Sequence, residues 1–264
     1  MKSIFKWSLQ QRKLSIIWWC IGMIAFIFLT LIFYPSFKQD AAELQKTFEN
    51  LPDAALQLLG GSTDFFSPIG YLNSQVYFIM LPLLLGIVAI GQGSNILTKE
   101  EQDNTIEGLL TRPVSRTKLL TSKALTGLAI LTIITFVTNI SIIIISKIVD
   151  LEVSMWSMTQ ATIVCYLMCL SFGAIAFLLT ATGKAKGASL GVATLIAFGG
   201  YIITSLSGTV TWLSNPSKLF PFNYYDSEAI LRGTYNWNNL WYFIIVIAAC
   251  AILSWITFRR RDIA

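Results

Sequence analysis

The sequence predicts an all-α integral membrane protein with six transmembrane helices, folded as a single domain over residues 1–264. Hydrophobic residues make up 55% of the chain and charged residues only 12%, whereas about 25% charge is usual in soluble proteins. Six uncharged runs are long enough to cross a bilayer, for which about 20 residues suffice. They are residues 14–37, 72–97, 124–146, 155–182, 188–207 and 238–258.

The chain begins with a basic amphipathic segment at residues 1–13. Ile4 and Trp7 alternate there with Lys2 and Lys6, a pattern typical of a helix lying along a membrane surface. We expect an elbow helix on the cytoplasmic face, followed by a first span that is retained as an anchor. A cleaved signal peptide is disfavoured, because the apolar run is too long and no small-residue cleavage site follows it.

Residues 38–71 form the largest polar segment and are expected on the outer face. The apolar residues recur there at steps of three and four, first from Phe37 to Phe48 and then from Leu51 to Leu59. Pro52 suits the first turn of a helix, and Gly60 and Gly61 end the second repeat. This outer helical segment is therefore predicted to hold two short amphipathic helices, since a linker would not keep its apolar residues in phase.

The most informative stretch is residues 98–123, which carries nine charged residues between two uncharged spans. Such a stretch must lie in water at one membrane face. Ile106, Leu109 and Leu110 fall on one side of a helix, and acidic residues crowd its first turns, where the helix dipole favours them. Arg112 precedes Pro113 and marks the end of the helix. The pattern predicts a short amphipathic helix between the second and third spans.

This stretch resembles the coupling-helix signature of type-2 ATP-binding-cassette (ABC) exporter permeases. The matching residues are Glu101, Asn104, Thr105, Ile106, Glu107, Leu109, Leu110, Pro113 to Arg116, and Lys123. Asn104 stands where the family commonly has glycine. The resemblance implies that the segment docks into a groove of a separate cytoplasmic ATPase subunit. The contact residues would be Glu100, Glu101, Thr105, Ile106, Glu107, Leu109, Leu110 and Arg116.

Two features of the second half bear on packing. Gly183, Gly187 and Gly191 form overlapping small-xxx-small repeats, which allow helix backbones to approach closely. We favour packing within the subunit over packing against a second permease subunit. Residues 207–237 are rich in aromatics around Pro221 and suit the outer interface, as an aromatic belt or a re-entrant element. The resemblance favours the re-entrant form.

The distribution of charge predicts the orientation. With both termini cytoplasmic, 14 of the 19 Lys and Arg residues lie in inner segments, as the positive-inside rule requires. We expect a multi-pass protein of a bacterial plasma membrane that contacts membrane lipid. The net charge of +5 follows this topology, so it does not indicate a nucleic-acid partner.

Several function classes are disfavoured by what the sequence lacks. It has no histidine, no Gly-rich Lys-Ser/Thr loop for a nucleotide, and no pair of ionisable residues within a span. We therefore expect no enzyme activity and no cofactor in this chain, with ATP and magnesium bound by the partner ATPase. The interpretation as an ion channel or a secondary carrier is disfavoured by the same lack of charged residues in the spans and by the absence of a visible inverted repeat.

The sequence thus predicts a permease subunit of an ABC transporter. It would export a hydrophobic or amphipathic substrate, such as a peptide, an antibiotic or a lipid-like molecule, with a second permease subunit as homodimer or heterodimer. A membrane sensor or scaffold that transports nothing remains the alternative, and it would be favoured if the neighbouring gene encoded no ATPase.

Overall fold

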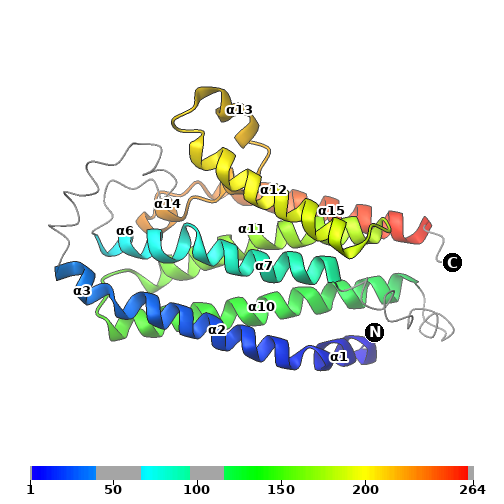
Figure 1. The fold of residues 1–264 in the computed structure, drawn as a ribbon, viewed down its shortest axis with the longest axis horizontal. Coiled ribbons are helices and arrows are strands. Elements are labelled where there is room, and N and C mark those ends of the chain that lie inside the picture. The colour runs from blue at the N-terminus through cyan, green and yellow to red at the C-terminus, as the bar shows by residue number, and fades with distance from the viewer. Residues whose placement is uncertain (1, 40–66, 96–115, 261–264) are drawn as a thin grey trace.

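The computed structural model describes residues 2–39, 67–95 and 116–260. Within them the chain is helical, and six long apolar helices pack side by side into an elongated bundle (Figure 1). The candidate spans cover Lys13–Lys38, Pro68–Asn95, Thr117–Ile148, Met155–Ala181, Lys186–Leu206 and Trp237–Arg260. The prediction of an all-α membrane protein with six spans is confirmed.

The first span is a helix that buries only one stripe of its surface. After α1 (Lys2–Gln11), α2 (Lys13–Ile32) buries Met23, Ile27 and Leu31, which are spaced four residues apart. This stripe belongs to the main core, and α2 packs along α10 (Arg116–Ile148). Apolar residues on its other sides, such as Trp18, are exposed. A helix that is apolar all round yet buried on one stripe is suited to lipid on its remaining faces.

The second span contains a π-helical turn that the sequence did not predict. It consists of α6 (Pro68–Leu72), the π-helix η1 (Asn73–Tyr77) and α7 (Met80–Asn95). Ser67 caps its start, because the Ser67 hydroxyl accepts a hydrogen bond from Gly70 N at 3.0 Å. Tyr77, within the π-helix, donates to Met158 O at 2.9 Å. This interruption places the Tyr77 ring in the core against α11 (Met155–Ala181).

The third long helix, α10, begins at Arg116, eight residues before the expected start of the third span. Residues 116–123, assigned by the sequence to the coupling segment, are therefore the first turns of α10. The expected boundary was set where charge ends, but charged residues do not end a helix. Lys118 stays exposed while the helix continues beyond the apolar run.

The helix α11 lies at the centre of the bundle. It packs against α7, α10, α12 (Lys186–Leu206) and α15 (Leu240–Arg260). Its closest approach is to α7, where glycines replace side chains at the crossing. A Cβ added at Gly93 would clash with the carbonyl oxygen of Gly173, and one at Gly173 would lie 3.0 Å from Ala89 O. Backbones can approach this closely only where both helices carry very small residues.

Residues 207–239 fold back over one end of the bundle in short helices. These are η2 (Thr211–Leu213), α13 (Ser214–Ser217), η3 (Pro221–Tyr224), α14 (Ser227–Arg232) and η4 (Trp237–Asn239). A further short helix, α3 (Tyr34–Gln39), continues the first span. The Phe222 ring lies 5.7 Å from that of Phe172, a residue within α11. The segment thus packs against both α11 and α12, since Phe222 also contacts Tyr201 of α12, and its re-entrant form stays a prediction.

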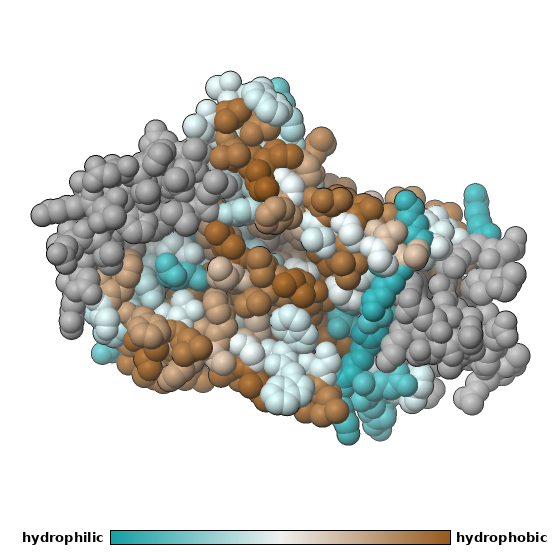
Figure 2. Space-filling view, in the orientation of Figure 1, coloured by the Kyte–Doolittle hydropathy of each residue, from teal (hydrophilic) through white to brown (hydrophobic). Residues whose placement is uncertain are grey.

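The surface separates an apolar middle from a polar end. Figure 2 shows apolar residues over much of the middle of this face and a band of hydrophilic residues across its right-hand part. The start of α1 and the end of α15 lie at that same end of the bundle (Figure 1). An apolar belt bordered by a polar band is the pattern of a protein held in a bilayer.

Candidate coupling end and apolar groove

Most of the predicted ATPase-contact residues lie outside the described residues. These are Glu100, Glu101, Thr105, Ile106, Glu107, Leu109 and Leu110. Residues 40–66 of the predicted outer helical segment also lie outside. Arg116 is placed as the first residue of α10. The two helices that flank the predicted coupling helix, α7 and α10, both reach the end of the bundle where α1 lies (Figure 1).

The junction between α1 and α2 is tied to the end of α7. Arg12, which stands between the two helices, donates from Nη1 to Gln92 Oε1 at 2.7 Å. Gln92 lies one turn before Asn95, the last residue of α7. A charged donor makes this one of the stronger kinds of hydrogen bond. The N-terminal segment therefore holds α7 close to the point where the predicted coupling segment begins.

A second contact ties α1 to the start of α10. Lys123 is only 4% exposed, and its Nζ donates to Ser8 Oγ at 3.0 Å. The Lys123 ammonium also lies 5.7 Å from the centre of the Trp7 ring. Burying a lysine is costly unless it finds such partners, and a hydrogen bond and a cation–π contact supply part of the compensation. We call the contacts of Trp7, Ser8 and Arg12 with Gln92 and Lys123 the α1 brace.

The α1 brace predicts a non-additive effect on stability. Lys123→Met and Ser8→Ala should each lower the melting temperature of the protein in detergent, because each removes a hydrogen-bond partner of a buried polar group. The double variant should lose less than the two losses added together, with a coupling of about 0.5–3 kcal/mol. Differential scanning fluorimetry of the four proteins measures this, and strictly additive losses would mean that the two side chains do not depend on one another.

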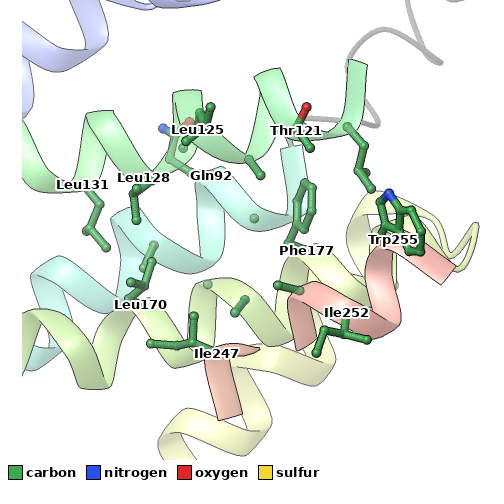
Figure 3. Close-up of a pocket in the computed structure, with 18 residues that line it drawn as sticks. Gln92, Thr121, Leu125, Leu128, Leu131, Leu170, Phe177, Ile247, Ile252 and Trp255 are labelled. Carbon is green, nitrogen blue, oxygen red and sulfur yellow. The ribbon is translucent and has the colours of Figure 1, made fainter. Parts of the chain in front are cut away.

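An apolar groove of about 590 Å³ lies beside the α1 brace. Its walls come from α7, α10, α11 and α15, and Gln92 belongs both to the groove and to the brace. Residues with small side chains form much of the wall, which is why the space stays unfilled: Ala89, Gly93, Ala124, Gly127, Gly173, Ala174 and Ala251. Figure 3 shows Phe177 between Thr121 of α10 and Trp255 of α15 at one end of the groove.

The chemistry of the groove is that of an apolar binding surface. Gln92 and Thr121 are its polar side chains, and no lining residue is ionisable. Thr121 already donates to Thr117 O at 2.8 Å within its own helix. Leu125, Ile252 and Trp255 are exposed at the opening. Such a surface can hold a hydrocarbon chain and offers nothing for acid–base chemistry.

A smaller polar cavity of about 310 Å³ lies at the other end of the bundle, near η1, α12 and α14. Its acidic residues have structural partners. Asp226 Oδ1 accepts from Ala229 N at 2.9 Å as the cap of α14, and Glu228 pairs with Arg232 at 2.9 Å. Ser227 Oγ donates to Asn73 Oδ1 at 2.6 Å and joins α14 to the π-helix. The first two contacts stabilise α14 itself, and the third holds α14 on the bundle.

Tyr235 joins two parts of the segment formed by residues 207–239. Its hydroxyl donates to Tyr224 O at 2.7 Å. Burial raises the pKa of Tyr235 to about 12, a rise reinforced by Asp226 and opposed by a hydrogen bond with Asn239. The phenol therefore stays protonated and able to donate throughout the physiological pH range.

The glycine repeat on α12 does not pack as expected. Gly183 lies in the turn before α12 at φ +92°, and a Cβ at Gly187 or Gly191 would meet nothing within 4 Å. Our preferred interpretation, packing within the subunit, is therefore not met among the described residues. The side of α12 that faces the bundle carries Ser189 and Ala193 instead. Each lies two residues after a glycine, and two residues turn an α-helix by about 200°.

Comparison with known protein families agrees with this architecture. The family model described as ABC-2 family transporter protein matches residues 3–263. No curated protein matches the sequence significantly. The family supplies membrane subunits that work with an ABC ATPase subunit. The chain belongs to the ABC-2 family of transporter proteins and is a multi-pass permease subunit of an ABC transporter.

Proposed function

We propose that the chain exports a hydrophobic or amphipathic substrate, of the peptide, antibiotic or lipid-like class, when a separate ATPase subunit binds the predicted coupling helix. The observation that carries this proposal is the arrangement of α7 and α10. The coupling segment joins these two helices, α1 braces both of them, and both form walls of the groove. A force applied to the segment would thus act on the bundle through two adjacent helices.

The proposed contact with the ATPase has an apolar centre and a charged edge. Ile106, Leu109 and Leu110 would fill a pocket on the ATPase, while Glu100, Glu101 and Glu107 would meet polar or basic groups around it. Desolvated central contacts usually dominate an interface, and charges at the edge contribute less. Thr105 would lie beside the apolar centre. Arg116, as the first residue of α10, would carry the displacement into the bundle.

The class of substrate follows from the spans. The described spans carry charged residues only in and near their terminal turns, at Lys13, Lys38, Lys118, Lys123, Lys147, Lys186, Arg259 and Arg260. A path lined by these helices would be uncharged, which suits apolar or amphipathic molecules and not ions. Two permease subunits would be needed to enclose such a path. The open side of α12 at Gly187 and Gly191 is a candidate surface for the second subunit, whether identical or different.

We place both termini in the cytoplasm of a bacterial cell. In the described residues, the end of the bundle near α1 carries Lys6, Arg12, Lys13, Lys118, Lys184, Lys186, Arg259 and Arg260 and no acidic residue. The opposite end carries four cations, Lys38, Lys147, Lys218 and Arg232, beside four acidic residues, Asp150, Glu152, Asp226 and Glu228. The positive-inside rule assigns the first end to the cytoplasm.

This orientation predicts a labelling pattern. In a variant without the four native cysteines, Ala185→Cys should react with a membrane-impermeant maleimide only after the cells are opened. Ser214→Cys should react on intact cells, because both positions are exposed and they precede and follow the candidate span α12. The reverse pattern would overturn the orientation, and labelling of both positions on intact cells would overturn the topology.

Transport itself is tested by reconstitution. The permease is copurified with its ATPase, and molecules carried with the complex are extracted with organic solvent and identified by mass spectrometry. ATP should then drive the identified molecule across proteoliposomes that contain both subunits. If ATP hydrolysis proceeds normally and no extracted compound moves, a sensor or scaffold role replaces transport.

A further inference from the structure

The groove beside the α1 brace also has a charged border at the end nearest the bundle terminus. Trp255 lines the groove, and the Arg259 guanidinium lies 4.7 Å from the centre of the Trp255 ring. Across the groove, Thr121 lines the wall on α10, and Lys118 lies one turn before it on the same side of that helix. The apolar space therefore ends between two helices that both carry cations.

We infer that this groove binds an anionic phospholipid of the cytoplasmic leaflet. One acyl chain would lie along the apolar wall, and the phosphate would meet Arg259 and Lys118. Basic pockets between membrane helices on the cytoplasmic side are typical sites for anionic headgroups. The inference depends on the orientation proposed above but not on transport.

The dimensions and position of the groove support a lipid chain as its occupant. A volume of about 590 Å³ lies within the range of about 300–1,000 Å³ usual for ligand sites. The groove opens through Leu125, Leu128 and Ile252, exposed apolar residues on helices that span the bilayer. An empty apolar space would lose the dispersion contacts of its walls, and a flexible chain already present in the leaflet can fill it.

The charges favour an anionic lipid over a second copy of the protein. A symmetric contact with a second copy would bring Arg259 and Lys118 close to the same cations of its partner, and repulsion opposes this. An anionic phosphate is instead attracted to this border. Trp255 also suits the level of the headgroups, where tryptophan is enriched in membrane proteins.

Native mass spectrometry of the full-length protein in detergent tests the inference. The protein is titrated with dioleoyl phosphatidylglycerol and, separately, with dioleoyl phosphatidylcholine. The wild type should bind phosphatidylglycerol more tightly. Arg259→Gln should weaken phosphatidylglycerol binding about five-fold, as expected for one cation near an anionic headgroup, and should leave phosphatidylcholine binding nearly unchanged. Lys184→Gln, at the same end of the bundle but not beside the groove, should bind like the wild type.

Filling the groove provides a test of the acyl-chain site. Ala251→Phe places a ring in the groove and should reduce binding of both lipids. Ala249→Phe is the matched control, because Ala249 is exposed on α15 but does not line the groove. Equal affinity of the wild type for the two lipids, or equal binding by Ala251→Phe and Ala249→Phe, would overturn the inference. The inference would also be overturned if another amphiphile copurified in the groove and neither lipid displaced it. That amphiphile, and not an anionic phospholipid, would then be the occupant. ATP-driven transport by the complex can succeed or fail independently of these results.

Discussion

Replacing Gly93 by leucine should prevent α7 and α11 from packing and should sharply lower the yield of monodisperse protein. The Cβ alone would clash with the Gly173 carbonyl oxygen, and it would lie 3.0 Å from the Ala176 Cβ. The obstacle is largely backbone, so a change of side-chain rotamer cannot relieve it. Overpacking of this kind costs about 3 kcal/mol or more, which corresponds to a drop of roughly 6–12 °C in melting temperature for a chain of this size.

The matched control for Gly93→Leu lies two residues earlier in the same helix. A Cβ at Gly91 would meet nothing within 4 Å, so Gly91→Leu should behave almost like the wild type. Gly173→Leu should reproduce the loss from the other side of the crossing, because its Cβ would press on the Ala89 backbone. Fluorescence-detected size-exclusion chromatography after heating compares the three variants. Equal melting temperatures for Gly91→Leu and Gly93→Leu would show that this crossing does not control stability.

The second large effect is expected at the proposed ATPase contact. Ile106→Asp should release the ATPase or uncouple hydrolysis from transport, because it puts a charge where we propose a desolvated apolar contact. Leu109→Ala should act in the same direction by removing buried apolar area, at a cost of about 2 kcal/mol. That cost corresponds to roughly a thirty-fold loss of affinity. Glu100→Gln, at the edge of the contact, should have little effect.

A charge series at Glu107 separates a coupling contact from a solvated loop. Glu107→Lys should be more harmful than Glu107→Gln, since it adds repulsion to the lost contact. Pull-down of the ATPase by the tagged permease and ATP hydrolysis in liposomes measure the two effects. A solvated loop predicts that all five substitutions, at Glu100, Ile106, Glu107 and Leu109, leave binding and hydrolysis intact.

The spans could be predicted because their signal is local. Each uncharged run is long enough to cross the hydrocarbon core of the bilayer. A single segment can pair all its backbone N–H and C=O groups there only by forming a helix. The ends of the spans are harder to predict from the sequence, for a physical reason. The helix α10 begins at Arg116 because helix hydrogen bonding continues past the last apolar residue, and hydropathy does not report hydrogen bonding. The π-helix at Asn73–Tyr77 has no comparable local signal.

The contacts around the candidate site could not be predicted because they join distant parts of the chain. Lys123 belongs to the coupling-helix signature in the sequence, but its partner Ser8 lies 115 residues away. The groove likewise depends on small residues from four helices. The repeat at Gly183, Gly187 and Gly191 shows the limit of spacing as evidence. The pattern is compatible with close packing, but it does not say which side of α12 faces the bundle.

The central claim is that a separate ATPase subunit acts on this permease through the segment between α7 and α10. The most direct test is site-specific photocrosslinking in membranes that contain both subunits. A photoreactive phenylalanine analogue at Ile106 should crosslink to the ATPase, and the same analogue at Ser214, in the segment that follows α12 and that we place on the outer face, should not. The account would be contradicted if the analogue at position 106 crosslinked only to lipid or to the permease itself while the ATPase is bound and active.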